Sequence, residues 1–589
     1  MRDFANIVPH RTRPMSSPHT DAPALRSNLR LWPGVALVTI LLVLRFAIPA
    51  FDPGFTGPGM LSSLALTLLT FIWWLGFSRA RRTKRWGAML VILLGIFASY
   101  LTVHPSIGTG MMGIAVVMYS APLLCLVLVL WAWMARRPAN GNRFGILMVG
   151  CALVTVGLNL LRSDGMRGED GSDLAWRWQQ TPEELLLARG EQELATLPEV
   201  PAGELQVTEW SGFRGPNRDS ILHGSQIQRD WASSPPQELW RRPVGPAWSS
   251  FAVRGDLFFT QEQRGEEEVV GCYRVSTGEP IWRHRDEIRF WESNAGAGPR
   301  ATPTLHGEIL LTLGATGHLN ALKVSDGTPI WSKNAASDAQ VEVPEWGFSS
   351  SPLVVGDLVI VAMPSTLLAY AIADGELRWS SAPGEQSYGS AHLLTLAGVP
   401  QVVLLREPGA VSVAPEDGTI LWEYPLEGVP CVQPALCPNG DVLLGGGQGR
   451  AMSRVSVKQK ESGWAVEEVW QSRRMKPYFN DYVVHEDYIY GFDGSILACI
   501  DLETGSRQWK GGRYGYGQFL LLADQDLLVV LTEQGELALV EAKPEAFTEL
   551  ARVPAIEGKT WNLPVLVDDV LLVRNDQEMA AFRLSTIGE

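Results

Sequence analysis

Two patterns of hydrophobic and polar positions divide the chain. The first 162 residues hold five long apolar runs, at residues 31–50, 60–78, 87–103, 110–134 and 144–161. Each run is close to the roughly 20 helical residues that cross a bilayer. Beyond residue 206 the apolar runs are short and separated by polar turns, as in β-strands. The pattern predicts an N-terminal all-α transmembrane bundle of five helices, followed by an all-β domain.

A repeat organises the second half of the chain. Residues 275–282 (VSTGEPIW) are typical of a strand end, a tight turn on Thr-Gly and a short strand that closes on tryptophan. Related segments end at Trp240, Trp331, Trp379, Trp422, Trp470 and Trp509. Successive tryptophans lie 42, 49, 48, 43, 48 and 39 residues apart. A period in the forties with several short strands predicts a β-propeller. We expect each tryptophan to pack on the turn that precedes it and to dock adjacent blades.

The strand pattern predicts eight blades, the first at residues 249–284 and the last at 560–584. The last segment holds only three strands. Residues 238–244, upstream of the first blade, are expected to supply the fourth. Joining both ends of the propeller in one blade leaves no free sheet edge. Seven blades is the alternative.

Charge differs sharply between the two halves. Through Arg162 there are 15 Lys and Arg against 3 Asp and Glu, whereas the remainder holds 34 against 60. So acidic a propeller argues against nucleic acid as a partner, because binding phosphate backbones needs clustered cations.

The distribution of cations predicts the membrane topology. The N-terminal tail and the second and fourth connections carry 13 Lys and Arg, whereas residues 51–59 and 104–109 carry none. This positive-inside alternation predicts a cytoplasmic N-terminus, and five crossings then place everything after residue 162 on the outer side. Arg45 interrupts the first run. It either reaches the headgroups from the end of its helix or forms an intramembrane site. The runs otherwise lack Asp, Glu, Lys and His, which argues against a transporter.

Four segments follow from these patterns: a cytoplasmic tail (1–30), a five-helix transmembrane domain (31–162), a periplasmic connector (163–206) and the propeller (207–589). Within the connector, Thr181 followed by proline and two glutamates predicts a capped helix over residues 182–196, acting as a spacer or a lid. Cys431 and Cys437 either pair in an oxidising compartment or stay separate thiols.

The repeat resembles that of pyrroloquinoline-quinone (PQQ) proteins, whose form is an apolar strand followed by Asp-x-x-Thr-Gly-x-x-x-Trp. Residues 500–509 (IDLETGSRQW) match it fully, and residues 210–219 (WSGFRGPNRD) look like the lead-in of bacterial PQQ-like propellers. The resemblance covers residues 207–589 and implies an eight-bladed propeller. That superfamily includes quinoprotein dehydrogenases and non-enzymatic scaffolds such as an outer-membrane assembly lipoprotein. The order of domains is similar to that of membrane-bound quinoprotein glucose dehydrogenase. It implies a bacterial inner-membrane protein with a periplasmic propeller.

The segments that lead into each blade converge near the propeller axis, and here they are rich in aromatic and amide residues. The candidate ligand-binding residues are Trp291, Asn294, Arg300, Trp346, Tyr388, Tyr478, Asn480, Arg513, Tyr514, Lys559, Trp561 and Asn562. Such a ring suits a small planar or polyhydroxylated ligand, and its cations suit an anionic cofactor such as PQQ. The alternative is a plug of side chains that satisfy one another.

Two functions remain open from the sequence. The first is a binding or scaffold module in contact with the lipid bilayer and with a small ligand or periplasmic proteins. The second is a PQQ-dependent dehydrogenase that oxidises an alcohol or sugar and reduces ubiquinone. The resemblance then implies a catalytic base, with Asp481 and Asp493 as candidates, and a calcium ion held by Glu292, Asn294 and Asp481. The chain lacks the adjacent Cys-Cys pair of many alcohol-oxidising members, and its propeller is compact.

Overall fold

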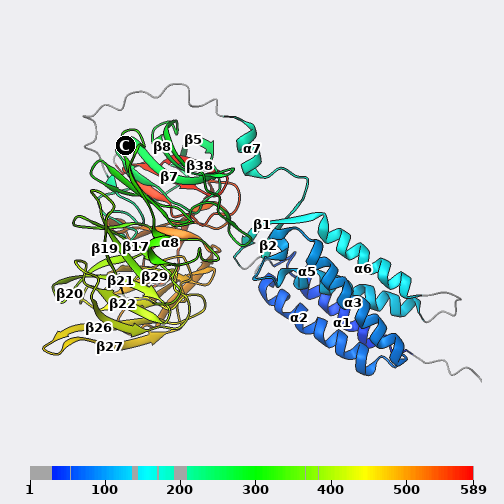
Figure 1. The fold of residues 1–589 in the computed structure, drawn as a ribbon. Coiled ribbons are helices and arrows are strands. Elements are labelled where there is room, and N and C mark those ends of the chain that lie inside the picture. The colour runs from blue at the N-terminus through cyan, green and yellow to red at the C-terminus, as the bar shows by residue number, and fades with distance from the viewer. Residues whose placement is uncertain are drawn as a thin grey trace, which may run out of the picture.

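The protein folds into a helical domain and a β-propeller that meet at a short hairpin (Figure 1). The computed structural model describes residues 29–52, 55–135, 143–168, 171–190, 209–364, 366–381 and 384–587. Most of the predicted tail, Arg136, Arg137 and residues 191–206 of the connector lie outside the described residues.

The helical domain contains a helix at each predicted apolar run. Its elements are α1 (Trp32–Leu42) continuing as the π-helix η1 (Val43–Ala47), α2 (Thr56–Ile72) continuing as η3 (Trp73–Phe77), α3 (Arg82–Thr102), the short α4 (Pro105–Gly108), α5 (Ala115–Met134) and α6 (Phe144–Asn159). Helices Thr56–Phe77, Arg82–Thr102 and Ala115–Met134 are long and apolar enough to cross a membrane, whereas Trp32–Ala47 and Phe144–Asn159 are shorter.

Arg45 is buried inside the bundle rather than extended along its surface. Its side chain lies in η1 at 7% exposure. The guanidinium carbon is 5.3 Å from the ring centre of Phe46 and 5.6 Å from that of Tyr119 in α5. Aromatic faces attract a guanidinium, so Arg45 is held by one ring of its own helix and one of a neighbouring helix.

A polar hairpin that the sequence pattern did not predict follows α6. Strands β1 (Leu161–Arg167) and β2 (Gly171–Trp176) pair antiparallel. Helix α7 (Pro182–Ala188) comes next and begins as predicted: Thr181 and Glu184 form a capping box. The described helix ends at Ala188, short of residue 196. Its Glu183 pairs with Arg289 of the propeller at 2.8 Å, so α7 rests on the first blade.

Eight blades, each with four antiparallel strands, form the propeller, and two of these sheets carry a short fifth strand. In chain order they are β6–β9 (Ala252–Arg254, Leu257–Arg264, Glu267–Arg274, Pro280–Asp286), β12–β15 (Thr304–His306, Ile309–Leu313, His318–Lys323, Pro329–Asn334), β16–β19 (Leu353–Val355, Leu358–Met363, Thr366–Ala371, Leu377–Ser380), β20–β23 (His392–Leu396, Val399–Arg406, Gly409–Val413, Ile420–Pro425), β24–β27 (Ala435–Leu436, Val442–Gly445, Met452–Lys460, Gly463–Ser472), β28–β31 (Val483–His485, Tyr488–Asp493, Ile496–Asp501, Arg507–Arg513), β32–β35 (Gln518–Leu522, Leu527–Leu531, Glu536–Glu541, Glu549–Pro554) and β36–β38 (Val565–Val567, Val570–Arg574, Glu578–Arg583) with β5 (Gln237–Pro243). The alternative of seven blades is therefore excluded.

Both ends of the propeller meet in the eighth blade, as predicted. Strand β5 pairs antiparallel with β38 and supplies the outer strand. Two short strands extend neighbouring blades: β3 (Glu209–Trp210) joins β6, and β4 (Ile221–Leu222) lies parallel to β32. Smaller elements between blades are β10 (Trp291–Glu292), β11 (Gly296–Ala297), α8 (Ala335–Ala339) and the 3-10 helix η5 (Ala523–Gln525). Because the chain closes on itself, no blade is left with a free edge at the junction.

Six of the seven repeated tryptophans form a hydrogen bond to the next blade. Trp282 donates its indole N–H to the carbonyl of Val324, 2.9 Å away in the following blade. The same bond, at 2.6–3.0 Å, is made by Trp240, Trp331, Trp379, Trp470 and Trp509. Trp422 instead donates to Gln401 within its own blade. The prediction that adjacent blades are docked in this way is confirmed.

The prediction that each tryptophan packs on the turn that precedes it was, however, wrong. Trp282 covers Gly327 of the next repeat, where an added Cβ would lie 2.4 Å from the ring. Gly278, in the turn that precedes Trp282, is covered by Trp240. The reason is geometric: a side chain near the end of an outer strand faces the neighbouring blade rather than its own turn.

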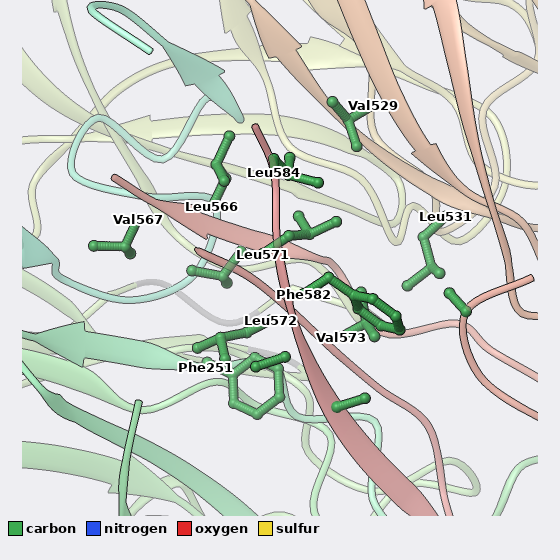
Figure 2. Close-up of a cluster of buried hydrophobic side chains, with 14 of the residues drawn as sticks. Phe251, Val529, Leu531, Leu566, Val567, Leu571, Leu572, Val573, Phe582 and Leu584 are labelled. Atoms are coloured by element: carbon green, nitrogen blue, oxygen red, sulfur yellow. The ribbon is translucent and has the colours of Figure 1, made fainter. Parts of the chain in front are cut away.

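Hydrophobic clusters fill the space between blades. Figure 2 shows part of the cluster that spans the junction of the last blades with the first; it includes Phe251, Val529, Leu572 and Phe582. Apolar burial contributes roughly 25 cal/mol per Å². Because the ends of the propeller meet here, the packing reinforces the ring closure made by β5.

Candidate functional site

A cavity of about 480 Å³ lies between one mouth of the propeller channel and the helical domain. The helical side supplies Met111 and Met112 from the loop before α5, and Met166 and Gly168 from the hairpin. The propeller side supplies Phe213, Arg214, Trp248, Ser250, Glu292, Asn294, Ala295, Arg300, Thr302, Trp346, Ser349, Tyr388, Ser390, Cys431, Gln433, Gln448, Tyr478, Phe479, Asp481, Tyr516, Gln518, Trp561 and Leu563. The volume is that of a pocket for a small organic molecule.

Main-chain hydrogen bonds seat the helical domain on the propeller mouth. Asn294 accepts at two oxygens: its side-chain Oδ1 from the N–H of Met111 at 3.2 Å, and its carbonyl from the N–H of Met166 at 2.7 Å. These bonds join the loop and the hairpin to the segment between the first two blades. The pocket is therefore roofed by a different domain from the one that forms its walls.

Glu533 joins three segments that line the pocket. Its carboxylate accepts the N–H of Gly168 at 2.7 Å, the indole N–H of Trp561 at 2.7 Å and the backbone N–H of Tyr516 at 3.2 Å. Gly168 approaches so closely that an added Cβ would lie 2.3 Å from Tyr516 Cδ2. A Cβ at this position would force the Tyr516 ring, the Glu533 carboxylate or the hairpin itself to move.

Eight of the residues in the wall are aromatic: Phe213, Trp248, Trp346, Tyr388, Tyr478, Phe479, Tyr516 and Trp561. Trp346 and Tyr388, from neighbouring blades, have ring centres 4.7 Å apart and planes 31° apart. Phe479 lies 5.1 Å from Trp561 and 5.3 Å from Tyr516. Such spacings are typical of favourable aromatic pairs, so the rings within each of these two groups support one another.

The charged side chains in the wall occur as pairs. Arg300 Nη2 lies 3.1 Å from Glu292 Oε1, and both side chains are about nine-tenths buried. Arg214 lies 3.6 Å from Asp481, which also accepts the N–H of Gln433 at 2.6 Å. Burial raises the pKa of Asp481, and Arg214 opposes that shift.

Lys559 lies close to the pocket without lining it. Its Nζ is 4.3 Å from the ring centre of Trp561 and 4.9 Å from that of Trp248. The residue is 4% exposed, and burial lowers its pKa, opposed mainly by Asp576. Its positive charge is directed at two indole rings.

The structure brings together eight of the residues expected at the mouth. Lining the cavity are Glu292, Asn294, Arg300, Trp346, Tyr388, Tyr478, Asp481 and Trp561. The others lie elsewhere. Trp291 is 41% exposed in β10, because strand alternation turns Glu292 inward instead.

The remaining residues have structural partners. Asn480 accepts the N–H of Tyr478, and Asn562 donates to the carbonyls of Ala247 and Ser249. Arg513 contacts Ser495, and Tyr514 donates to Glu549. These four residues therefore stabilise the propeller around the channel and do not form its surface.

Asp493 lies among three cations. Its carboxylate is 3.0 Å from Lys476 and 2.7 Å from both Arg507 and Lys510. Hydrogen bonds and charge from Lys510 and Lys476 outweigh burial and lower its pKa. A carboxylate held in its ionised form by three cations, away from the pocket, is a poor general base.

The expected calcium ligands do not fit a cation. Glu292 accepts the N–H groups of Asn294 and Ala295, each at 2.7 Å, in addition to pairing with Arg300. Asn294 Oδ1 accepts from Met111, and Asp481 is paired with Arg214. Calcium requires six to eight oxygen ligands, but here these oxygens are directed at protein donors.

Cys431 and Cys437 are separate thiols. Cys431 lines the pocket and Cys437 is buried beside its own blade's core. Burial raises the pKa of each to about 12, so both favour the protonated form.

Several lining residues were not predicted: Met111, Met112, Met166, Gly168, Phe213, Trp248, Phe479 and Tyr516. For Trp248 a signal existed, because residues 248–250 (WSS) lead into the first blade as residues 346–350 (WGFSS) lead into the third. The methionines carried no such signal, since they belong to loops outside the repeat.

The blades and their tryptophan contacts define the C-terminal domain as an eight-bladed β-propeller with PQQ-like repeats. Residues 265–511 match the family model described as outer membrane protein assembly factor BamB, which confirms the assignment of the repeat. No curated protein sequence matches the chain.

Solved structures with a similar fold share little sequence with this chain. BamB from Moraxella catarrhalis is 13% identical, with 60% of this chain and 99% of that chain covered and a TM-score of 0.45. The quinohemoprotein alcohol dehydrogenase ADHIIG from Pseudomonas putida HK5 is 11% identical, with 67% and 84% covered and a TM-score of 0.47. A europium-containing methanol dehydrogenase is 12% identical, with 64% and 98% covered and a TM-score of 0.41.

Proposed function

We propose that this chain is a membrane-anchored binding module whose small-ligand pocket lies between the propeller mouth and the helical domain. The observation that carries the proposal is the cavity of about 480 Å³, walled by aromatic side chains and roofed by Met111, Met112 and Met166. A largely apolar pocket with a few convergent polar groups, at a domain interface, is typical of small-molecule sites.

We further propose that the helices anchor the propeller in a bacterial inner membrane, with the N-terminus cytoplasmic and the propeller periplasmic. Three long apolar helices and two shorter ones support the anchor. The orientation rests on the 13 cations in the tail and the second and fourth connections, against none in the first and third. The lipid bilayer is then one partner, and the ligand or a periplasmic protein is another.

The pocket supports binding better than quinoprotein catalysis. Catalysis of that kind needs an available base and a coordinated cation beside the cofactor. Here Asp493 lies apart with three cations, and the oxygens of Glu292 and Asn294 are engaged by protein donors. The dehydrogenase that would reduce ubiquinone is thus the weaker candidate.

The test uses the full-length protein in lipid nanodiscs and titrates three probes separately: PQQ with calcium, 2-naphthamide, and glucose. Binding of each probe is measured by calorimetry. At least one probe should bind saturably, and binding should be lost in Trp561→Ala and Trp346→Ala. Trp464→Ala is the control, because Trp464 lies in β27, away from the pocket. Absence of saturable binding by all three probes would contradict the proposal, and dye-linked turnover with PQQ would favour the dehydrogenase.

A further inference from the structure

The charges and hydrogen bonds of the pocket narrow the class of its ligand. We infer that it takes a neutral, planar ring compound rather than an anion or a sugar, an inference that rests on the proposed pocket function.

Arg300 uses four of its five N–H groups in hydrogen bonds to the protein. Its Nε donates to the carbonyl of Trp346 at 3.0 Å, Nη1 donates to Gly298, and Nη2 donates to Gly296 at 2.9 Å and to Glu292 at 3.1 Å. An anionic ligand would have to displace the buried Glu292 to reach this guanidinium. Leaving a buried carboxylate unpaired is costly.

Arg214 is held in the same way. Its Nε donates to Ser220 at 3.0 Å, and Nη2 donates to the carbonyls of Asp219 and Tyr482, each at 2.9 Å. Its ion-pair partner is Asp481. The two cations and two carboxylates that line the pocket therefore balance one another in charge, and each arginine is paired with a carboxylate.

Lys559 does not provide an anion-binding site either. It lies outside the lining, against the rings of Trp248 and Trp561, and its acidic neighbours include Asp576 and Glu533. A carboxylate in the pocket would compete for this ammonium group with the two indole rings and the acidic neighbours. It would gain little from the charge and would still lose its water.

Three polar side chains of the wall are also committed to the protein, whereas the buried indole Nε1 of Trp346 has no hydrogen-bond partner among the described residues. Ser250 Oγ donates to the carbonyl of Leu563 at 2.6 Å, and Ser349 Oγ to that of Tyr388 at 2.7 Å. Gln518 Nε2 donates to Phe479 at 3.3 Å. A polyhydroxylated ligand would bury several hydroxyl groups against few matching partners, which costs free energy. A flat ring instead stacks on the aromatic wall and against the methionine roof.

The experiment compares two isosteric probes, neutral 2-naphthamide and anionic 2-naphthoate, by calorimetry with the full-length protein in nanodiscs. We expect the amide to bind about tenfold more tightly or better, because the carboxylate loses hydration without gaining a partner. Glu292→Gln removes the negative charge that pairs with Arg300. It should reduce the ratio of 2-naphthamide affinity to 2-naphthoate affinity about fivefold or more. Asp481→Asn is the second variant, should the first fail to fold.

Glu423→Gln is the matched control. Glu423 also pairs with an arginine, Arg406 at 2.7 Å, but lies in β23 away from the pocket, and its loss should leave the preference unchanged. Equal or tighter binding of 2-naphthoate by the unaltered protein would overturn the inference while the pocket stands. Failure of both naphthalene probes, with PQQ or glucose bound, would also overturn it. If none of the probes bound saturably, the proposed pocket function itself would be contradicted.

Discussion

Glu268 shows how a single buried carboxyl makes stability depend on pH. It lies in β8 at 5% exposure and accepts the N–H of Ala315 at 3.1 Å in the next blade. Burial raises its pKa to about 7. An acid whose pKa is higher in the folded than in the unfolded protein binds more protons when folded, so stability falls as pH rises from about 4.5 to about 7.

Glu268→Gln should therefore stabilise the propeller at pH 8, by about 3 kcal/mol at most, since each pKa unit corresponds to about 1.4 kcal/mol. Near pH 4 the difference from the unaltered protein should vanish. The measurement is the apparent Tm of both proteins across this range. Glu427→Gln, whose side chain is 72% exposed, is the control. A constant difference at every pH would show that this carboxyl does not titrate as described.

At the scale of the element, the contact between a tryptophan and the next turn sets the blade repeat. Gly327 has φ +71° and lies under Trp282, where an added Cβ would clash. Gly307 has a similar φ of +53° in another turn, with open space around it. The two glycines thus separate backbone strain from steric conflict.

Gly307→Ala should cost about 1 kcal/mol, from the left-handed backbone alone. Gly327→Ala should cost about 1–3 kcal/mol more, because the ring of Trp282 must move. Chemical denaturation of the two variants measures the difference. Equal losses would mean that the tryptophan does not press on the following turn.

The blades were predictable because each is the same local unit repeated. A Thr-Gly turn and a closing tryptophan recur, as at Gly278 and Trp282, and their spacing gives the number of units. The incomplete last unit also indicated the strand exchange through β5. The hairpin β1–β2 was missed, because its residues 161–167 and 171–176 are polar and do not alternate.

At the scale of the whole molecule, the site was only half predictable. Ring closure forces the segments before each blade to one mouth, so Trp346, Tyr388 and Trp561 could be expected together. The roof could not, since the contact of Met111 with Asn294 joins residues 183 positions apart. Nothing in a local pattern encodes the docking of one domain on another.

Docking of the two domains depends on the close approach of Gly168. Gly168→Ala should loosen the hairpin from Tyr516 and Glu533 and speed hydrogen exchange across residues 161–168. Gly157→Ala is the control, because that glycine of α6 has open space around it. Unchanged exchange in Gly168→Ala would show that the hairpin does not rest on the rim.

The orientation in the membrane gives a further test. A fusion of alkaline phosphatase after residue 587 should be active, because the propeller is proposed to be periplasmic. A fusion within the fourth connection, near residue 140, should be inactive, since its cations favour the cytoplasmic side. The reverse pattern would contradict the proposed topology.

The most direct measurement of the central claim is a cryo-EM structure of the full-length protein in a lipid nanodisc with 2-naphthamide. We predict that the propeller mouth faces the helical domain and that the naphthyl ring lies among Trp346, Tyr388 and Trp561, beneath Met111. A propeller mouth turned away from the helices, or a probe bound elsewhere, would contradict a ligand pocket at this domain interface.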